Sequence, residues 1–228
     1  NSTGNCLWVN EIGDENRAED MGLSLSNDAN GNVYVTGYYQ GTASFGNGIS
    51  ISSVVHPLYL TPSVDIFVAK FNTNGVCQWA NTAGSYQTEK GFSIATDASG
   101  KSYVTGFFMY TSVFNGVSIT AASGFPDGFV AVYNTSGALT QLKAISGTEY
   151  EACYGITLDG AGNYYITGLK DGMTSFDSLN IQSYGSYDMF LAKYDVAGNV
   201  KWVRTTQGSQ WEEGKSVRCD ANGDPYVA

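Results

Sequence analysis

One segment of about ten residues occurs four times along this chain, and this repetition restricts the folds open to it. The copies read DANGNVYVTG from Asp28, DASGKSYVTG from Asp97, DGAGNYYITG from Asp159 and DANGDPYVA from Asp220. A second turn recurs at intervals of 71, 62 and 61 residues, marked by its glycines Gly4, Gly75, Gly137 and Gly198. A fixed period of this kind indicates one supersecondary unit that is copied and stacked on itself.

Each copy predicts four β-strands. In the second repeat these are GFSIATD from Gly91, KSYVTGFF from Lys101, DGFVAVY from Asp127 and ALTQLKAIS from Ala138. The Asp-x-x-Gly between the first two strands is the chemistry of a tight turn, in which glycine takes the left-handed position. The glycine after Tyr-Val-Thr lets a neighbouring backbone approach closely or lets the strand bend. Both faces of the third strand are largely apolar, so each small sheet must be covered on both sides.

Small sheets that are apolar on two faces stack radially in a β-propeller, with one four-stranded antiparallel blade per repeat. We expect blades at about 20–82, 90–145 and 152–206, with part-blades at 1–19 and 214–228 and an incomplete ring. The repeat exceeds the usual propeller length of about 40–50 residues. The surplus fits a short excursion after strand two, and VVHPLYLTP in the first repeat is a loop insertion. A parallel β-helix is disfavoured because its coils are shorter and lack two hairpins per unit.

The motif Asp-x-x-Gly-Asn-x-Tyr-Val-Thr-Gly, followed by Asp-x-Phe-Val-Ala-Lys and a tryptophan, resembles the SBBP-type β-propeller repeats of bacterial secreted and surface proteins. The FGNGISI insert resembles the version found in Bacteroidota. The resemblance covers nearly the whole chain but departs from the pattern at Gln141, where tryptophan is expected, and at Lys101 and Asp224. It implies an exported, extracellular or cell-surface protein, and it brings no catalytic residues with it.

The composition excludes several classes of partner. The net charge is −10 and only 14% of the residues are charged, so the basic surface that binds nucleic acid or anionic lipid is missing. No apolar run approaches the roughly 20 residues of a membrane span. The four cysteines lack paired spacing and are accompanied by a single histidine, which argues against zinc. Free thiols and one disulfide remain equally open for Cys6, Cys77, Cys153 and Cys219.

Two sets of acidic residues have both a structural and a chemical interpretation. Asp28 with Asn30 and Asp220 with Asn222 are arranged like the start of a calcium loop, but the other copies break the ligand pattern while every copy keeps the turn glycine. We therefore favour turns without metal. A second set precedes the first strand of each repeat and offers carboxylates for glycoside hydrolysis or, as the simpler account, for structural hydrogen bonds at the blade junctions: Asp20, Glu89, Glu151 and Glu212.

Aromatic clusters supply the candidate ligand-binding residues. Flat rings suit sugar stacking, although blade packing is their commoner use; the candidates are Tyr38, Tyr39, Phe107, Phe108 and Tyr110. Asp177-Ser178-Leu179 resembles an O-glycosylation signal of Bacteroidota, with Ser178 as acceptor. The sequence thus predicts a non-catalytic scaffold or interaction module without a cofactor. Its partners are expected to be proteins, glycans, or further repeats and neighbouring copies at the open ends; a glycan-binding adhesin and a carbohydrate-active propeller are the alternatives.

Overall fold

The computed structural model describes residues 3–13 and 19–228, and within them every regular element is a β-strand. Three blades are antiparallel four-stranded meanders. Blade 1 contains β1 (Met21–Asn27), β2 (Val33–Gln40), β5 (Val64–Phe71) and β6 (Cys77–Gly84). Blade 2 contains β7 (Lys90–Thr96), β8 (Ser102–Phe108), β11 (Asp127–Tyr133) and β12 (Leu139–Gly147). Blade 3 contains β13 (Ala152–Leu158), β14 (Tyr164–Lys170), β17 (Asp188–Tyr194) and β18 (Val200–Thr205).

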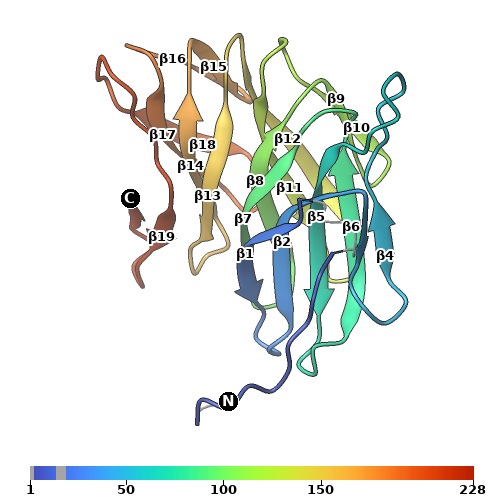
Figure 1. The fold of residues 1–228 in the computed structure, drawn as a ribbon. Coiled ribbons are helices and arrows are strands. Elements are labelled where there is room, and N and C mark those ends of the chain that lie inside the picture. The colour runs from blue at the N-terminus through green and yellow to red at the C-terminus, as the bar shows by residue number, and fades with distance from the viewer. Residues whose placement is uncertain (1–2, 14–18) are drawn as a thin grey trace.

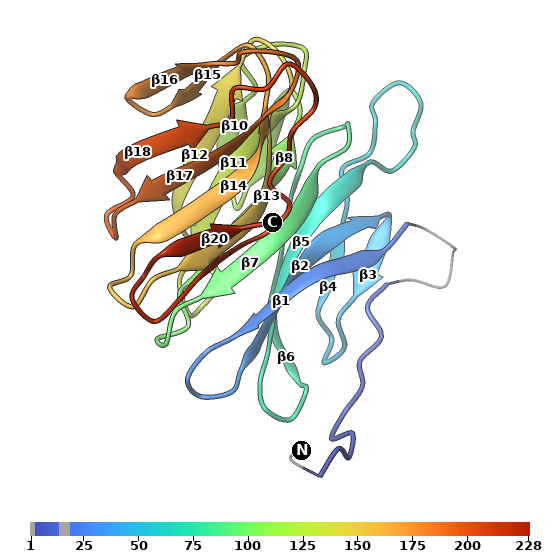
Figure 2. The same ribbon diagram turned by 90° about the vertical axis from the view of Figure 1, so that its left-hand side faces the viewer.

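The blades are arranged as in a β-propeller, with their first strands innermost (Figures 1 and 2). Serine hydroxyls join neighbouring first strands: the Ile94 amide donates to Ser24 Oγ and the Ile156 amide to Ser93 Oγ, both at 3.3 Å. A two-stranded sheet, β19 (Val217–Cys219) and β20 (Pro225–Val227), continues the series beside blade 3. Among the described residues no strand pairing joins this sheet to blade 1, so no closed ring is seen. The same residues contain no helix that could cross a membrane.

Two hydrophobic cores lie between blades, and a third lies on the other face of blade 1, where Phe67 and Phe71 pack with Phe45. One core combines Tyr34, Ile66 and Val68 of blade 1 with Ile94 and Phe129 of blade 2. The next repeats this arrangement between blades 2 and 3. A propeller blade therefore buries its apolar surface against its neighbours, as the two-sided apolar pattern of the sequence predicts.

The predicted excursion of each repeat is a β-hairpin, which we name a clasp. The clasps are β3 (Thr42–Ser44) with β4 (Ser50–Ser52), β9 (Thr111–Phe114) with β10 (Val117–Thr120), and β15 (Met173–Phe176) with β16 (Leu179–Gln182). Each clasp packs a phenylalanine edge-to-face on its own blade: Phe45 on Phe67, Phe114 on Phe129 and Phe176 on Phe190.

The clasps also bind the preceding blade. Strand β9 pairs with β6 and strand β15 pairs with β12, so each hairpin extends the sheet before its own. In the first repeat, Ser44 of β3 exchanges backbone hydrogen bonds with Gly13 of the N-terminal segment. Sequence reasoning predicted the excursions but not this exchange, because strand pairing across repeats leaves no local signal.

Long side chains at one repeated position, Trp8, Trp79 and Gln141, cap a turn of the blade that follows them. The indole Nε1 of Trp8 donates to the Thr73 carbonyl at 3.1 Å, and that of Trp79 donates to the Thr135 carbonyl at 3.2 Å. Gln141 stands where tryptophan is expected, and its amide Nε2 donates to the Ala197 carbonyl at 3.1 Å. The substitution therefore keeps the hydrogen bond and loses the aromatic ring.

Glycine permits this capping because its lack of a Cβ leaves room for the ring. Gly137 has φ +83°, and a Cβ built there would lie 2.8 Å from the Trp79 ring. Gly106 at the end of Tyr-Val-Thr shows the close backbone approach that the sequence predicts, since a Cβ there would overlap the Lys90 carbonyl. Gly137 is therefore required by contact as well as by conformation, whereas Gly106 is required by contact alone.

Replacing Gly137 with alanine should destabilise the protein by about 3 kcal/mol, because left-handed strain adds to the clash with Trp79. The matched control is Gly116→Ala, since Gly116 has φ +81° but open space around it, and about 1 kcal/mol is expected there. Denaturant unfolding of the two variants measures the difference. Equal losses would show that the packing of Trp79 on the turn contributes nothing.

Candidate functional site

The two ends of the strands present different surfaces. One end carries the Asp-x-x-Gly and Asn-x-x-Gly turns, and we name it the turn face. The other carries the longer connections, approximately 53–63, 84–89, 109–111, 121–126, 147–151, 183–187 and 206–216, and we name it the loop face. In Figure 1 the turns of blade 1 lie at the lower edge, and the connection 53–63 projects at the upper right.

Exposed aromatic side chains collect on the loop face. Of those in the part of the chain that is described, six lie in its connections: Tyr59, Tyr86, Tyr110, Phe125, Tyr184 and Trp211. One other, Tyr226, lies on β20. Because burial of aromatic rings is strongly favourable, the six exposed rings make this end of the propeller the candidate binding surface.

The five aromatic residues predicted to bind a ligand differ in how far they are exposed. Tyr39 and Phe108 have no exposed surface, so they pack inside blades 1 and 2 and cannot contact a sugar. Tyr38 and Phe107 are 8% and 9% exposed. Tyr38 lies under the Lys90 ammonium, 4.0 Å from its ring centroid, and so serves packing. Tyr110 alone of the five is substantially exposed, at 43%.

A row of rings on the loop face was missed by sequence reasoning. Phe107 contacts Tyr150, Tyr150 contacts Tyr187, and Tyr187 contacts Trp211 with ring centroids 4.5 Å apart. Tyr150 and Trp211 each directly precede the repeated glutamate before the first strand. An aromatic at that repeated position was the signal that could have identified them.

The repeated acids form buried junctions between blades. Asp65 begins the third strand of blade 1, and Glu89 follows 24 residues later, just before blade 2. The Val54 amide donates to Asp65, and the Ser85 amide and hydroxyl donate to Glu89. Asp127 and Glu151 repeat this spacing, as do Asp188 and Glu212. The clasps take part, because Ser112 of β9 donates to Glu89 and Thr174 of β15 donates to Glu151.

Burial raises the pKa of all four carboxyl groups at the first two junctions, Asp65, Glu89, Asp127 and Glu151. Burial raises the pKa of Asp65 to about 7, and burial with repulsion from Asp127 raises the pKa of Glu151 to about 9. Burial raises the pKa of the neighbouring Asp127 to about 6, so Glu151 is the member of this pair that keeps its proton at neutral pH. Asp65, Glu89, Asp127 and Glu151 are at most 1% exposed. Paired carboxyl groups suit glycoside hydrolysis, but a substrate has no access to these, so the geometry favours the structural interpretation.

The protein should lose stability as the pH rises. A carboxyl group whose pKa is raised on folding contributes stability that is fully present near pH 4 and is lost as the pH passes its folded value. Between pH 5 and pH 9 we therefore expect the free energy of unfolding to fall by several kcal/mol, with Glu151 as the largest contributor. Glu151→Gln, which stays neutral, should flatten this slope, whereas the exposed Asp224→Asn should leave it unchanged. A stability that rises across this range would contradict the raised pKa values of the buried acids.

The Asp-x-x-Gly segments form closed hydrogen-bonded turns. Asp28 Oδ1 accepts the amides of Asn30 and Asn32 at 2.9 and 3.0 Å, and Asp220 Oδ1 accepts those of Asn222 and Asp224. The carboxylates are thus directed at amide hydrogens of their own turns. Among residues 3–13 and 19–228 no group of three or more His, Cys, Asp or Glu side chains is arranged to hold a metal ion.

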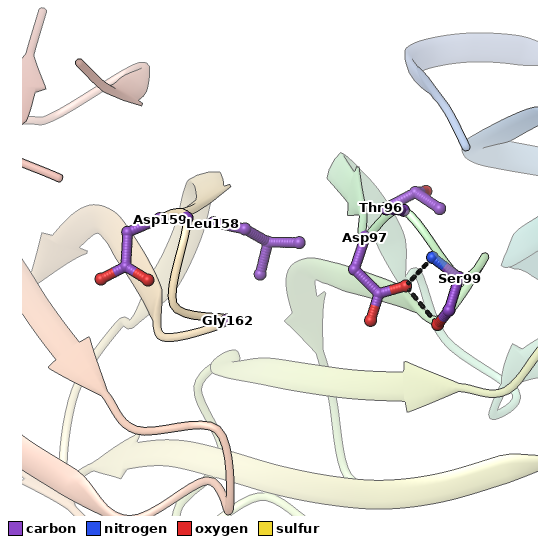
Figure 3. Close-up of a pocket in the computed structure, with 8 residues that line it drawn as sticks. Thr96, Asp97, Ser99, Leu158, Asp159 and Gly162 are labelled. Atoms are coloured by element: carbon purple, nitrogen blue, oxygen red, sulfur yellow. Dashed lines mark hydrogen bonds between the residues drawn. The ribbon is translucent and has the colours of Figure 1, made fainter. Parts of the chain in front are cut away.

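A groove separates two of these turns on the turn face. It is lined by Thr96, Asp97 and Ser99 from blade 2 and by Leu158, Asp159 and Gly162 from blade 3. Figure 3 shows the Asp97 carboxylate bonded to Ser99 of its own turn and Leu158 pointing into the space between the turns. Asp159 lies 3.6 Å from Lys193. Because Asp97 and Asp159 already interact with neighbouring residues, the groove offers a ligand few free polar groups.

The remaining candidates are the glycosylation acceptor Ser178 and the four cysteines. Ser178 is exposed at the tip of the β15–β16 clasp, beside an Asp177 that forms an ion pair of 2.8 Å with Lys143. Its glycosylation stays a prediction. All four cysteines are free, and burial raises the pKa of Cys77 to about 11.

Comparison with known proteins agrees with a repeat protein of the propeller type. No model of a known protein family matches the chain. The uncharacterized WD repeat-containing protein L264 of Acanthamoeba polyphaga mimivirus is 24% identical, and the alignment covers 86% of this chain but 16% of that protein. The chain therefore spans about a sixth of this relative. A crystal structure of a protein of unknown function from Bacteroides caccae is 11% identical, covers 89% of this chain and 86% of its own, and has a TM-score of 0.29.

Proposed function

We propose that this chain is a non-catalytic binding module of an exported bacterial protein, and that it contacts a protein partner through its loop face. The observation that carries the proposal is the set of six exposed aromatic rings on that face. Rings of this kind are the residues that most often anchor protein interfaces. The opposite end of the blades presents polar turns whose hydrogen bonds are already made within the turn.

The absence of catalysis in this proposal rests on the repeated acids. Asp127 and Glu151 are the pair of carboxyl groups most suited to acid–base chemistry, yet both have no exposed surface. Their hydrogen bonds instead join two blades and a clasp. Placement outside the cell, in a secreted or surface protein of SBBP type from Bacteroidota, rests on the resemblance of the repeat motif and is part of the proposal.

Site-specific photo-crosslinking tests the partner surface. A photoreactive amino acid at Tyr184 on the loop face, 64% exposed, should cross-link to a distinct protein in the organism that makes this chain. The same group at Val196 on the turn face, 60% exposed, is the matched control and should not. The cross-link should weaken when Trp211 is replaced with alanine. Equal cross-linking from both faces, or none from Tyr184, would contradict the proposal.

We also propose that the exposed first strand of blade 1, β1, packs against another repeat, supplied by the same protein or by a neighbouring copy. Leu25 of β1 is 69% exposed, whereas its equivalents Ile94 and Ile156 are 4% and 1% exposed in the cores between blades. A leucine at this position is therefore suited to burial against a blade.

Sedimentation of the 228-residue chain checks whether copies meet at this surface. Association that increases with concentration is expected, and Leu25→Arg should abolish it because a charge would enter an apolar contact. Val196→Arg on the turn face is the control. A monomer at every concentration would rule out neighbouring copies as the partner of blade 1.

A further inference from the structure

Four rings on the loop face of blades 1 and 2 form one continuous surface, the aromatic platform. Tyr59 stacks on His56 with ring centroids 4.5 Å apart, His56 meets Tyr86 at 5.4 Å, and Tyr86 meets Tyr110 at 5.7 Å. The three tyrosines are 74%, 40% and 43% exposed in that order. The platform is thus a row of ring surfaces that contact one another and remain open to solvent.

Every ring of the platform departs from the repeat. Tyr110 occupies the position held by Gly41 and Gly172 in the other two clasps, and Tyr86 stands where Thr148 and Ser209 are found. His56 and Tyr59 belong to the insertion that only the first repeat contains. Since the repeat alone suffices to build a blade, these four residues are not needed for the fold.

The backbone at Tyr110 is strained. Tyr110 has φ +51°, and its glycine equivalents Gly41 and Gly172 have φ +83° and +60°. A left-handed conformation is unfavourable for a bulky residue and is free of strain for glycine. Strain retained by an exposed ring points to a function, because a glycine here would fold with less cost.

The insertion holds its rings rigidly. The amides of Leu58 and Tyr59 both donate to His56 Nδ1 at 3.2 Å, so the neutral imidazole carries its proton on Nε2. The His56 and Leu60 amides close the loop by donating to the Thr61 and His56 carbonyls. The ring surfaces are therefore set before a ligand arrives, which reduces the entropy lost on binding.

The chemistry around the platform is uncharged. The connections 53–63, 84–89, 109–111 and 121–126 contain one Asp, Glu, Lys or Arg, the fully buried Glu89, although the chain as a whole has a net charge of −10. What they offer is ring faces, phenol hydroxyls and an imidazole N–H. A ligand that fits must have apolar faces and neutral hydrogen-bonding edges, which describes an uncharged sugar chain.

We propose that the aromatic platform of His56, Tyr59, Tyr86 and Tyr110 binds a neutral oligosaccharide, whose pyranose rings stack on the tyrosine faces. This site deepens the proposed function and rests on its non-catalytic binding role. It takes three of the six exposed rings of the loop face, Tyr59, Tyr86 and Tyr110, and leaves Phe125, Tyr184 and Trp211 to the protein contact. Leu58 and Leu60 flank Tyr59 and are 81% and 76% exposed. A protein ligand would use these aliphatic side chains, whereas a sugar would not.

Binding to an array of neutral and acidic oligosaccharides, followed by calorimetric titration of the neutral ones, tests the site. The wild-type chain should bind neutral oligomers and not their sialylated or uronic-acid counterparts. Tyr59→Ala and Tyr110→Gly should each weaken binding about tenfold. Tyr184→Ala and the double variant Leu58→Ser/Leu60→Ser should bind as the wild type does. The recovered sugar should be intact, since cleavage would contradict a binding module.

Tyr110→Gly separates a lost ligand contact from a damaged fold. It restores the residue of the other repeats, so its melting temperature should equal or exceed that of the wild type while sugar binding falls. The proposal is overturned if no neutral sugar binds, if binding survives Tyr110→Gly, or if only the Leu58→Ser/Leu60→Ser variant loses it. Cross-linking from Tyr184 that persists without any sugar binding would retain the protein-binding function and remove this site alone.

Discussion

A blade of this protein cannot be stable by itself, because both of its faces are apolar. All other features follow from the need to place each four-stranded sheet between two neighbours. The interblade cores bury this surface. Three sets of polar contacts align the blades: serine hydrogen bonds between first strands, caps from Trp8, Trp79 and Gln141 onto the next turn, and buried carboxyl groups at the loop face. Each set joins one blade to the next.

The fold was predictable where its cause is local. The Asp-x-x-Gly turns, the glycine that admits a neighbouring carbonyl and the apolar alternation of the strands all act within a few residues, so one repeat contains the whole signal. The pairing of each clasp with the preceding blade was not predictable. Strands β9 and β6 belong to different repeats, and nothing in the sequence of either strand indicates that they pair. The buried acids at the blade junctions were predictable in part. Their spacing of 24 residues is written three times in the sequence, but only the structure shows that the pairs are buried.

In the candidate site, unlike in the fold, the informative residues are those that differ between the repeats. Residues that recur, such as Tyr39 and Phe108 at one repeated position, are buried and serve the blades. Residues that break the recurrence, such as Tyr110 in place of glycine, are exposed on the loop face. Sequence reasoning gave both groups the same interpretation because it judged residues by chemical type. In a repeat protein, the difference between copies separates packing from binding more sharply than the type of side chain does.

The clasps also govern how such a protein can change its length. Each clasp is encoded within one repeat but completes the sheet of the repeat before it, so every internal boundary between blades carries the same connection. If one whole repeat is inserted or deleted, the fourth strand before the altered position still meets a clasp of the same kind. This holds at whichever residue of the repeat the insertion or deletion begins. Blade number is then free to vary by recombination without a new interface having to arise, while the loops that differ between copies remain attached to the blades that display them.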